Sequence, residues 1–309
     1  HTKFKCDWSS DVCSSDLKRS RSTVQPGRRL LVADGSHPRR LMSTTPVRNE
    51  PRVGWSPARR SAWYHFEFYR QTWRGSVISN FLFPILYLGS MGMGVGHLVN
   101  AHAGLVEGHP YLDFVAPGLL AMTTMQVGSG ESMWPILGGL KWTRNYHAAI
   151  ATPLTPDDVL AGKVLFVAAR MFFTGVVYLG VMLAFGVVTS WWALLLPFVG
   201  VLVGLAFTTP LIAFSSTLES DAPFALVQRF LLTPMFLFSA TFYPISQYPA
   251  ALRPVVQIMP LYHGVELSRS AAFGSGVWTA MLAHCLVLVM LTVAGWWWAR
   301  RNFRRRLVL

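Results

Sequence analysis

Six long apolar segments, almost free of charge, constrain this chain more than any other feature. Only seven of its 27 Lys and Arg residues lie between Val77 and Ala299. A bilayer core requires about 20 apolar residues per helix and makes internal charge costly. The pattern therefore predicts an all-α, polytopic membrane protein with six transmembrane helices. The expected spans are about Ser76–Leu98, Leu112–Met133, Lys163–Val188, Trp191–Phe214, Pro223–Tyr243 and Val277–Ala299.

The scarcity of charge argues against a soluble protein. Charged residues make up 13% of the chain and hydrophobic residues 52%, whereas a soluble domain carries about 25% charged residues. A net charge of +13 would suit a nucleic-acid partner in a soluble domain. Here the basic residues flank apolar spans, so orientation in the bilayer and anionic headgroups explain them better. We expect membrane lipids, and no nucleic acid, as partners.

Basic residues also set the expected orientation. They cluster before the first span, between the second and third spans, and after the last span. Segments rich in Lys and Arg stay on the cytoplasmic side, and an even number of spans satisfies all three clusters. The sequence predicts a multi-pass protein of the plasma (cytoplasmic) membrane with N- and C-termini both cytoplasmic.

The chain divides into four stretches. Residues 1–41 hold no apolar run typical of a signal peptide, and HTKFKCDWSSDVCSSDL has the composition of translated adapter sequence. We expect these residues to be a non-native or disordered extension, with Met42 as the start of the protein itself. Residues 42–60 are expected to form a disordered cytoplasmic lead, residues 61–299 the transmembrane domain, and residues 300–309 a basic cytoplasmic tail.

An aromatic segment precedes the first span. In SAWYHFEFYRQTWRG, Trp63, Phe66, Tyr69 and Trp73 recur at near-helical spacing among arginines. Such a face suits a helix that lies in the cytoplasmic headgroup layer. We expect an N-terminal interfacial helix; the alternative is an early first turn of the first span.

The connection between the second and third spans is too polar to cross a membrane and too long for a simple turn. Its KWTRNYHAAI segment favours a short helix, which prolines then interrupt. Aromatic residues beside arginine are enriched at protein interfaces, and acids in a first helical turn favour the helix dipole. The candidate docking residues of this connection are Lys141, Trp142, Arg144, Tyr146, Pro153, Asp157 and Asp158.

Two opposite charges lie near the expected cytoplasmic ends of the second and third spans. Glu131 and Arg170 are candidates for an ion pair that holds a gate closed. The alternative is that both side chains extend separately into the headgroup layer.

Four prolines divide the largely apolar stretch from Phe236 to Arg269 into pieces too short to span the bilayer. This pattern fits a re-entrant helical hairpin on the extracellular face, buried in protein. Glu266 and Arg269 lie three residues apart, which favours a local ion pair. The prolines are Pro244, Pro249, Pro254 and Pro260.

Two of these segments carry a family resemblance. ATPLTPDDVLAGK resembles the cytoplasmic loop of ABC-2 type transporter permeases, and FLFSATFYPI followed by YPAALRPVVQIMPLYHGVELSR resembles their C-terminal signature. Within that family the chain most resembles the branch of nodulation lipo-oligosaccharide and daunorubicin-type export permeases, and the resemblance covers roughly Trp63 to Ala299. Ala240 is a departure, because the family often has glycine after the position of Ser239.

The resemblance implies the membrane-spanning permease subunit of an ATP-binding cassette exporter in a bacterium, moving a lipid-like, glycolipid or amphipathic drug cargo outward. It implies a separate ATPase subunit and a second permease chain as partners. The loop around Lys141–Asp158 would then couple to the ATPase. ATP and Mg would sit on that partner, so we expect no catalytic residue, cofactor or metal site in this chain.

The sequence leaves other functions open. It contains no GxxxxGK[ST] motif for nucleotide phosphates, and few intramembrane carboxylates for proton coupling. A secondary transporter or channel is the alternative, and would favour internal repeats or polar residues at mid-membrane. An intramembrane enzyme would require acids and histidines gathered at one membrane depth.

Overall fold

Helices form all of the regular structure that the computed structural model describes. It describes residues 56–102, 104–274 and 276–308; the side chains of residues 56 and 72–81 lie outside that description. Within these ranges there is no β-strand, only an isolated bridge between Val106 and His109. The all-α class is therefore confirmed. The expectations for residues 1–41 and for most of residues 42–60 lie outside the described residues, although helix α1 already begins at Ser56.

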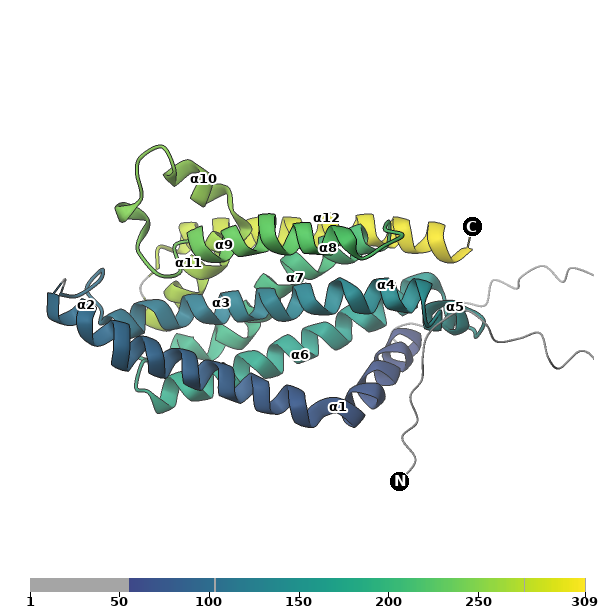
Figure 1. Ribbon diagram of the computed structural model, residues 1–309, viewed down its shortest axis with the longest axis horizontal. Coiled ribbons are helices and arrows are strands. Elements are labelled where there is room, and N and C mark those ends of the chain that lie inside the picture. The colour runs from purple at the N-terminus through teal and green to yellow at the C-terminus, as the bar shows by residue number, and fades with distance from the viewer. Residues whose placement is uncertain (1–55, 103, 275, 309) are drawn as a thin grey trace, which may run out of the picture. The chain divides into compact units, whose positions relative to one another are not determined.

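The helices follow one another through short connections (Figure 1). The N-terminal half contains α1 (Ser56–Gly89), the π-helical η1 (Ser90–Gly96), α2 (His97–His102), α3 (Tyr111–Ser132), α4 (Trp134–Lys141), α5 (Asn145–Ile150) and α6 (Pro156–Ala184). The C-terminal half contains η2 (Trp191–Leu195), α7 (Leu196–Ser215), α8 (Ala222–Val227), η3 (Gln228–Leu232), α9 (Thr233–Phe238), η4 (Ile245–Gln247), α10 (Arg253–Ile258), α11 (Pro260–Phe273) and α12 (Trp278–Val308).

Helices occupy all six positions predicted to span the membrane. In the described part of the chain, four stretches are long and apolar enough to cross a bilayer: Leu82–His102, Pro156–Ala184, Trp191–Ser215 and Trp278–Val308. The predicted fifth span corresponds to the apolar but shorter stretch Ala222–Phe238, and the predicted second span to α3. The count of six crossings stays a prediction.

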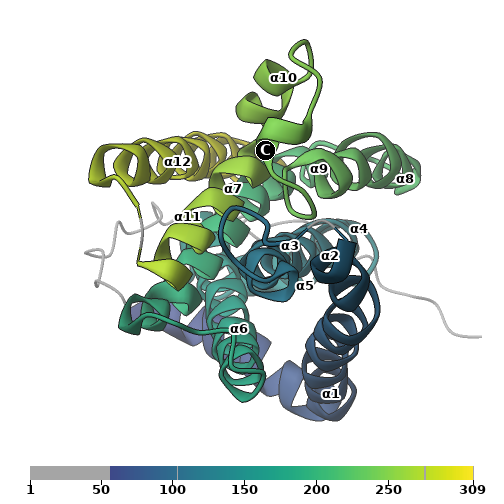
Figure 2. The ribbon, with the colours of Figure 1, turned by 90° about the vertical axis from the view of Figure 1, so that its left-hand side faces the viewer.

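The central position of α3 explains its lower hydropathy. This helix packs against α6, α7 and α11 (Figure 2), and every residue of Phe114–Met125 is buried. Protein rather than lipid surrounds it, so its small and hydroxyl-bearing side chains meet other helices, as is typical of helix contacts in membranes.

Small residues allow α3 and α7 to approach closely. A Cβ atom on Gly128 of α3 would lie 2.6 Å from Thr208 Oγ1 and 2.9 Å from the carbonyl oxygen of Gly204, both on α7. Such contacts are too short for a real side chain, so glycine is required where these backbones meet.

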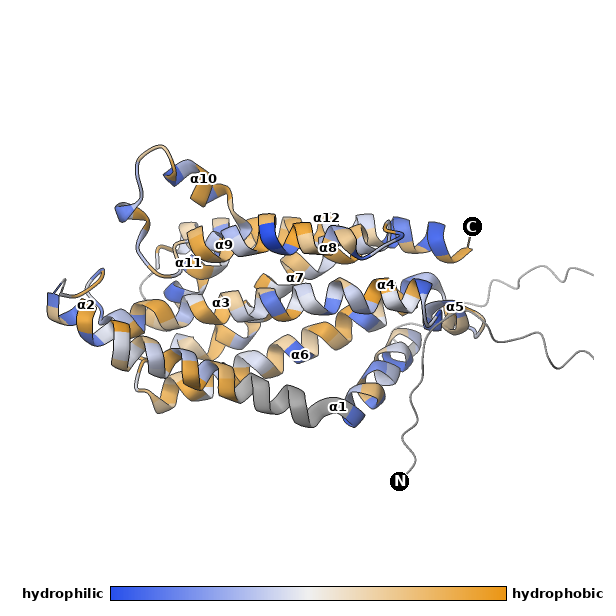
Figure 3. Cartoon of the chain, in the orientation of Figure 1, coloured by the Kyte–Doolittle hydropathy of each residue, from blue (hydrophilic) through white to orange (hydrophobic). Residues whose placement is uncertain are grey.

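The outer helices present apolar surface and one end of the bundle is polar. Only 11% of an apolar 18-residue stretch of α12 is buried, whereas 67% of the corresponding stretch of η2–α7 is buried. Hydrophilic residues gather around α5 and along the last turns of α12 (Figure 3). The apolar outer surface suits lipid, and the polar end suits water.

The aromatic segment that precedes the first span is helical. It belongs to α1, whose first turns run at a marked angle to the part that leads into η1 (Figure 1). Trp63 is 69% and Phe68 64% exposed, which suits a headgroup environment. The depth of this segment in a membrane stays a prediction.

Candidate functional site

The connection between α3 and α6 forms two short helices rather than the single helix that the sequence favours. Helix α4 ends at Lys141, and α5 begins at Asn145. Between them Arg144 adopts a left-handed conformation, with φ of 49°, which a residue other than glycine seldom adopts. This residue turns the chain and separates the two helices.

The aromatic residues of this connection divide into an exposed and a buried one. The Trp142 side chain is 59% exposed, whereas Tyr146 is only 3% exposed. Tyr146 contacts the rings of Phe303 and His65, with centroids 5.7 and 6.3 Å away, and burial raises the pKa of its hydroxyl. Tyr146 is therefore buried, because α5 turns that face toward α12 and α1. The docking role of this connection stays a prediction.

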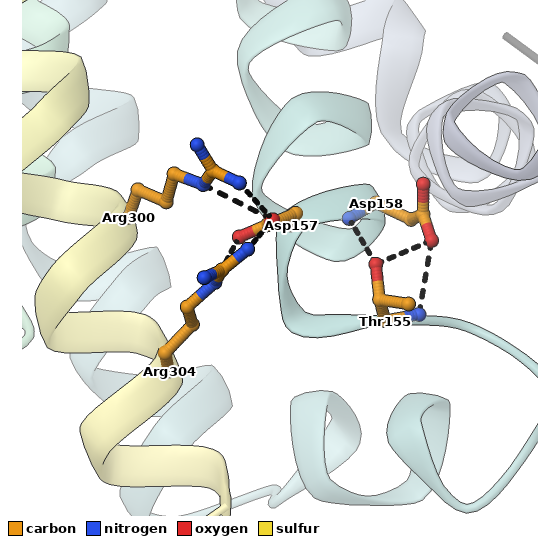
Figure 4. Close-up of polar contacts among 5 residues, drawn as sticks. All are labelled: Thr155, Asp157, Asp158, Arg300 and Arg304. Carbon is orange, nitrogen blue, oxygen red and sulfur yellow. Dashed lines mark hydrogen bonds and ion pairs between the residues drawn. The ribbon is translucent and has the colours of Figure 1, made fainter. Parts of the chain in front are cut away.

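Helix α6 begins with a capping box (Figure 4). The Thr155 hydroxyl accepts a hydrogen bond from the backbone N–H of Asp158 at 3.2 Å, and the Asp158 carboxylate accepts one from the backbone N–H of Thr155 at 3.0 Å. Pro156 follows at the first helical position, where its missing N–H costs nothing, and Pro153 lies in the preceding turn. Asp157 and Asp158 both lie in the first turn of α6, where the helix dipole favours acids.

Asp157 has a different partner from its neighbour. Its carboxylate accepts hydrogen bonds from the guanidinium of Arg300 at 2.9 and 3.0 Å, and from Arg304, Nε of which lies 2.8 Å away (Figure 4). Two charge-assisted contacts therefore tie the start of α6 to the end of α12.

A second acidic residue holds the same end of α12. Arg306 donates to the carbonyl oxygens of Ser216 and Leu218, each at 2.7 Å, and to the Glu219 carboxylate at 2.8 Å. Lys141 of α4 donates to the carbonyl oxygen of Glu219. The connection after α7 is thus joined to both α4 and α12.

The predicted basic tail continues α12 as a packed helix. This helix runs to Val308, with Phe303 and Leu307 buried against the side of α4 and α5. The sequence signal was present, because Phe303 and Leu307 lie four residues apart among arginines.

Glu131 and Arg170 form the predicted ion pair, and a third residue joins them. The carboxylate of Glu131 contacts the Arg170 guanidinium and also accepts a hydrogen bond from the Lys163 ammonium at 2.7 Å. Lys163 and Arg170 lie seven residues apart, so two turns of α6 place both on the face toward α3. Their side chains are 4% and 17% exposed, and that of Glu131 18%.

The Glu131 cluster, which consists of Glu131, Lys163 and Arg170, also contacts α1. The Arg170 guanidinium lies over the ring of Tyr69, 4.8 Å from its centroid. Burial, and then the positive charge of Lys163, lowers the pKa of His65 to about 4. The cluster thus joins three helices through charge.

The proline-rich stretch forms short elements, as predicted. Pro244 precedes η4, Pro254 lies in the first turn of α10, and Pro260 begins α11. Pro249 lies in the turn between η4 and α10. Whether this stretch is re-entrant stays a prediction.

Arg269 fixes this stretch to α3. It forms the predicted ion pair with Glu266 at 3.0 Å, and its guanidinium donates to the carbonyl oxygens of Phe114, Ala240 and Thr241 at 3.2, 2.6 and 3.1 Å. Ala240 is buried with φ of 59°, a conformation that favours glycine. The alanine that departs from the family pattern therefore occupies a position that a glycine would fill without strain.

Histidine placement adds one pair that the sequence did not indicate. His263 of α11 and His284 of α12 face each other, with their Nδ1 atoms 2.7 Å apart. Across the described ranges, no group of three or more His, Cys, Asp or Glu side chains is placed to hold a metal ion.

Long apolar helices with exposed outer faces, joined by ion pairs at one end of the bundle, define a multi-pass helical membrane protein. The chain belongs to the ABC-2 type transporter family, whose model matches residues 60–273. It is 30% identical to nodulation protein J of Rhizobium leguminosarum bv. viciae over 237 residues, which cover 75% of this chain and 88% of that protein. It is 26% identical to the inner membrane transport permease YadH of Escherichia coli K12 over 195 residues, or 62% of this chain and 74% of that protein.

Proposed function

We propose that this chain is the membrane-spanning permease subunit of an ATP-driven exporter, with a separate ATPase subunit and a second permease chain as partners. The observation that carries the proposal is the family match, which extends over the helices from α1 to α11. A relative named as a transport permease adds support. In this proposal the cargo is lipid-like, a glycolipid or an amphipathic drug, and moves outward across a bacterial cytoplasmic membrane.

The α4–α5 connection is the proposed docking segment for the ATPase. Trp142 and Arg144, two residues apart, are both exposed, and tryptophan and arginine are among the residue types that most often anchor protein interfaces. Tyr146 instead holds the segment against α12. The exposed pair would bind, and the buried tyrosine would make the segment rigid.

The ion pairs at the end of α12 can transmit a movement of the docking segment to the membrane-spanning helices. A displacement of α4 acts on Glu219 through Lys141, and Glu219 also holds Arg306 of α12. A displacement at the start of α6 acts on α12 through Asp157. The docking segment is therefore coupled to α3 and α6 by the chain itself and to α7 and α12 by ion pairs.

The Glu131 cluster is the proposed gate element. It lies between α3 and α6, the two helices that the docking segment joins. Two cations on one carboxylate give the cluster alternative pairings, so α3 can shift against α6 while the carboxylate keeps a partner.

The test is co-purification of the tagged permease with its ATPase subunit, for which a neighbouring gene with a GxxxxGK[ST] motif would be the candidate. Changing Trp142→Ala and Arg144→Ala together should reduce the ATPase recovered with the tagged permease at least tenfold and abolish transport, while the amount of inserted permease stays normal. Trp191→Ala is the matched control, because Trp191 is 70% exposed at the start of η2, beyond the end of α6 that lies away from the docking segment. Unchanged recovery with the double variant would remove the docking role from this segment.

A further inference from the structure

The five arginines near the end of α12 do two different things. Arg300 and Arg304 bind Asp157, and Arg306 binds Glu219. The other two, Arg301 and Arg305, are exposed. No acidic side chain in the described part of the chain pairs with either of them. These two exposed arginines are thus accessible to a partner outside the chain.

These two arginines continue an exposed apolar stripe. Residues four apart on a helix lie on one face, about 6 Å from each other, so Trp297, Arg301 and Arg305 follow one line. The Arg301 guanidinium lies 5.9 Å from the centroid of the Trp297 ring. Toward the start of α12 the same line is apolar and more than half exposed, at Leu282, Leu286, Met290, Val293 and Trp297.

This order of residue types matches the cross-section of a bilayer leaflet. Aliphatic side chains suit the hydrocarbon core, tryptophan prefers the headgroup level, and arginine binds phosphate through paired N–H groups. A face that is apolar for about four turns before it becomes basic favours a lipid over an acidic protein. A second copy of the chain is also disfavoured, because the same arginines would then face each other.

We propose that the Trp297–Arg305 face of α12 binds the headgroup of an anionic phospholipid, with Arg301 and Arg305 on its phosphate and Trp297 and Trp298 beside its glycerol. Trp298 is 42% exposed. The three arginines that clasp α6 and the connection after α7 leave this face free. The site rests on the lipid-facing position of α12 and not on what the protein transports.

The test measures lipid binding to the purified full-length permease without any ATPase. The probes are phosphatidylglycerol and phosphatidylcholine with identical acyl chains, and binding is followed by native mass spectrometry and by the thermal unfolding midpoint. Wild type should retain phosphatidylglycerol in preference. Arg301→Gln with Arg305→Gln should bind it about 30-fold more weakly, because each basic residue near an anionic surface contributes about 1 kcal/mol. Arg301→Lys with Arg305→Lys should keep most of the preference for phosphatidylglycerol over phosphatidylcholine.

The matched control is Arg59→Gln with Arg60→Gln, which removes the same charge from two exposed arginines of α1. This control should retain the lipid preference. An equal loss in both variants, or no loss in the α12 variant, would overturn the proposal. It would also be overturned if inorganic phosphate alone raised the unfolding midpoint as much as the lipid does. Dissociation of a dimer by the α12 variant, with lipid binding unchanged, would assign the face to a second copy instead.

Discussion

Glu131 is the single anion of a buried cluster that contains two cations, and this imbalance makes a quantitative prediction. Its carboxylate contacts Lys163 and Arg170, and the three side chains are between 4% and 18% exposed. Changing Glu131→Gln keeps the size of the side chain and removes the negative charge. Two cations then remain close together with little water around them.

The cost of this change follows from the geometry. Removing one partner of a buried ion pair costs about 3–5 kcal/mol of unfolding free energy. Lys163→Met instead removes the surplus cation and leaves a balanced pair of Glu131 with Arg170. The variant loses the Lys163–Glu131 hydrogen bond, but it no longer has to bury the lysine ammonium, and the two effects offset each other. We expect that change to cost about 1 kcal/mol or less.

Thermal unfolding of the purified protein in detergent measures both effects. For a chain of this size, 1 kcal/mol corresponds to about 2–4 °C, so Glu131→Gln should lower the midpoint by about 6–20 °C. Glu67→Gln is the matched control, because its 3.8 Å pair with Arg70 is exposed and should shift the midpoint by about 2 °C or less. The reasoning is refuted if Glu131→Gln behaves like Glu67→Gln, or if Lys163→Met costs more than Glu131→Gln.

Three further predictions follow from single positions. Ala240→Gly should raise the unfolding midpoint by a few degrees, because glycine relieves a left-handed conformation that costs alanine about 1 kcal/mol; a lower midpoint would show that the buried methyl group matters more. Burial, and then the charge of Lys163, lowers the pKa of His65 from 6.5 to about 4 in the folded protein. Between pH 6.5 and pH 4 the imidazole is therefore mainly neutral when folded and mainly protonated when unfolded, so unfolding takes up a proton. Stability should fall as pH drops from 6.5 to 4, and His65→Phe should flatten that slope in a melting series; an unchanged slope contradicts the assignment. Cysteines introduced near Arg59 and after Arg306 should resist an impermeant thiol reagent in intact cells, and labelling of either from outside contradicts the topology.

The sequence predicted the features that depend on the linear pattern. The helices at the six expected positions follow from runs of apolar residues, and the start of α6 follows from Pro156 with Asp157 and Asp158 in the first helical turn. The Glu131–Arg170 pair was predictable because both charges lie at the ends of adjacent spans. Each of these features needs only the order of residue types along the chain and the order of the spans.

Features that depend on which helix face meets which neighbour could not be predicted. Lys163 belongs to the Glu131 cluster because α6 begins earlier than the apolar run suggests, so this lysine lies two turns inside the helix. Tyr146 is buried because the left-handed residue Arg144 reorients α5. Which arginines of α12 form ion pairs and which stay exposed depends on where Asp157 lies, and the sequence does not show this.

Site-directed cross-linking between the permease and its ATPase can show whether the α4–α5 connection contacts that subunit. In a background without the native cysteines, Trp142→Cys would carry a short thiol-reactive cross-linker, and Trp191→Cys would serve as the control with similar exposure. Position 142 should become linked to the ATPase subunit in membranes, with a yield that nucleotide changes, whereas position 191 should give no product. Linkage of position 191 but not position 142 would contradict the proposed docking segment, and linkage of neither would contradict the ATP-driven exporter.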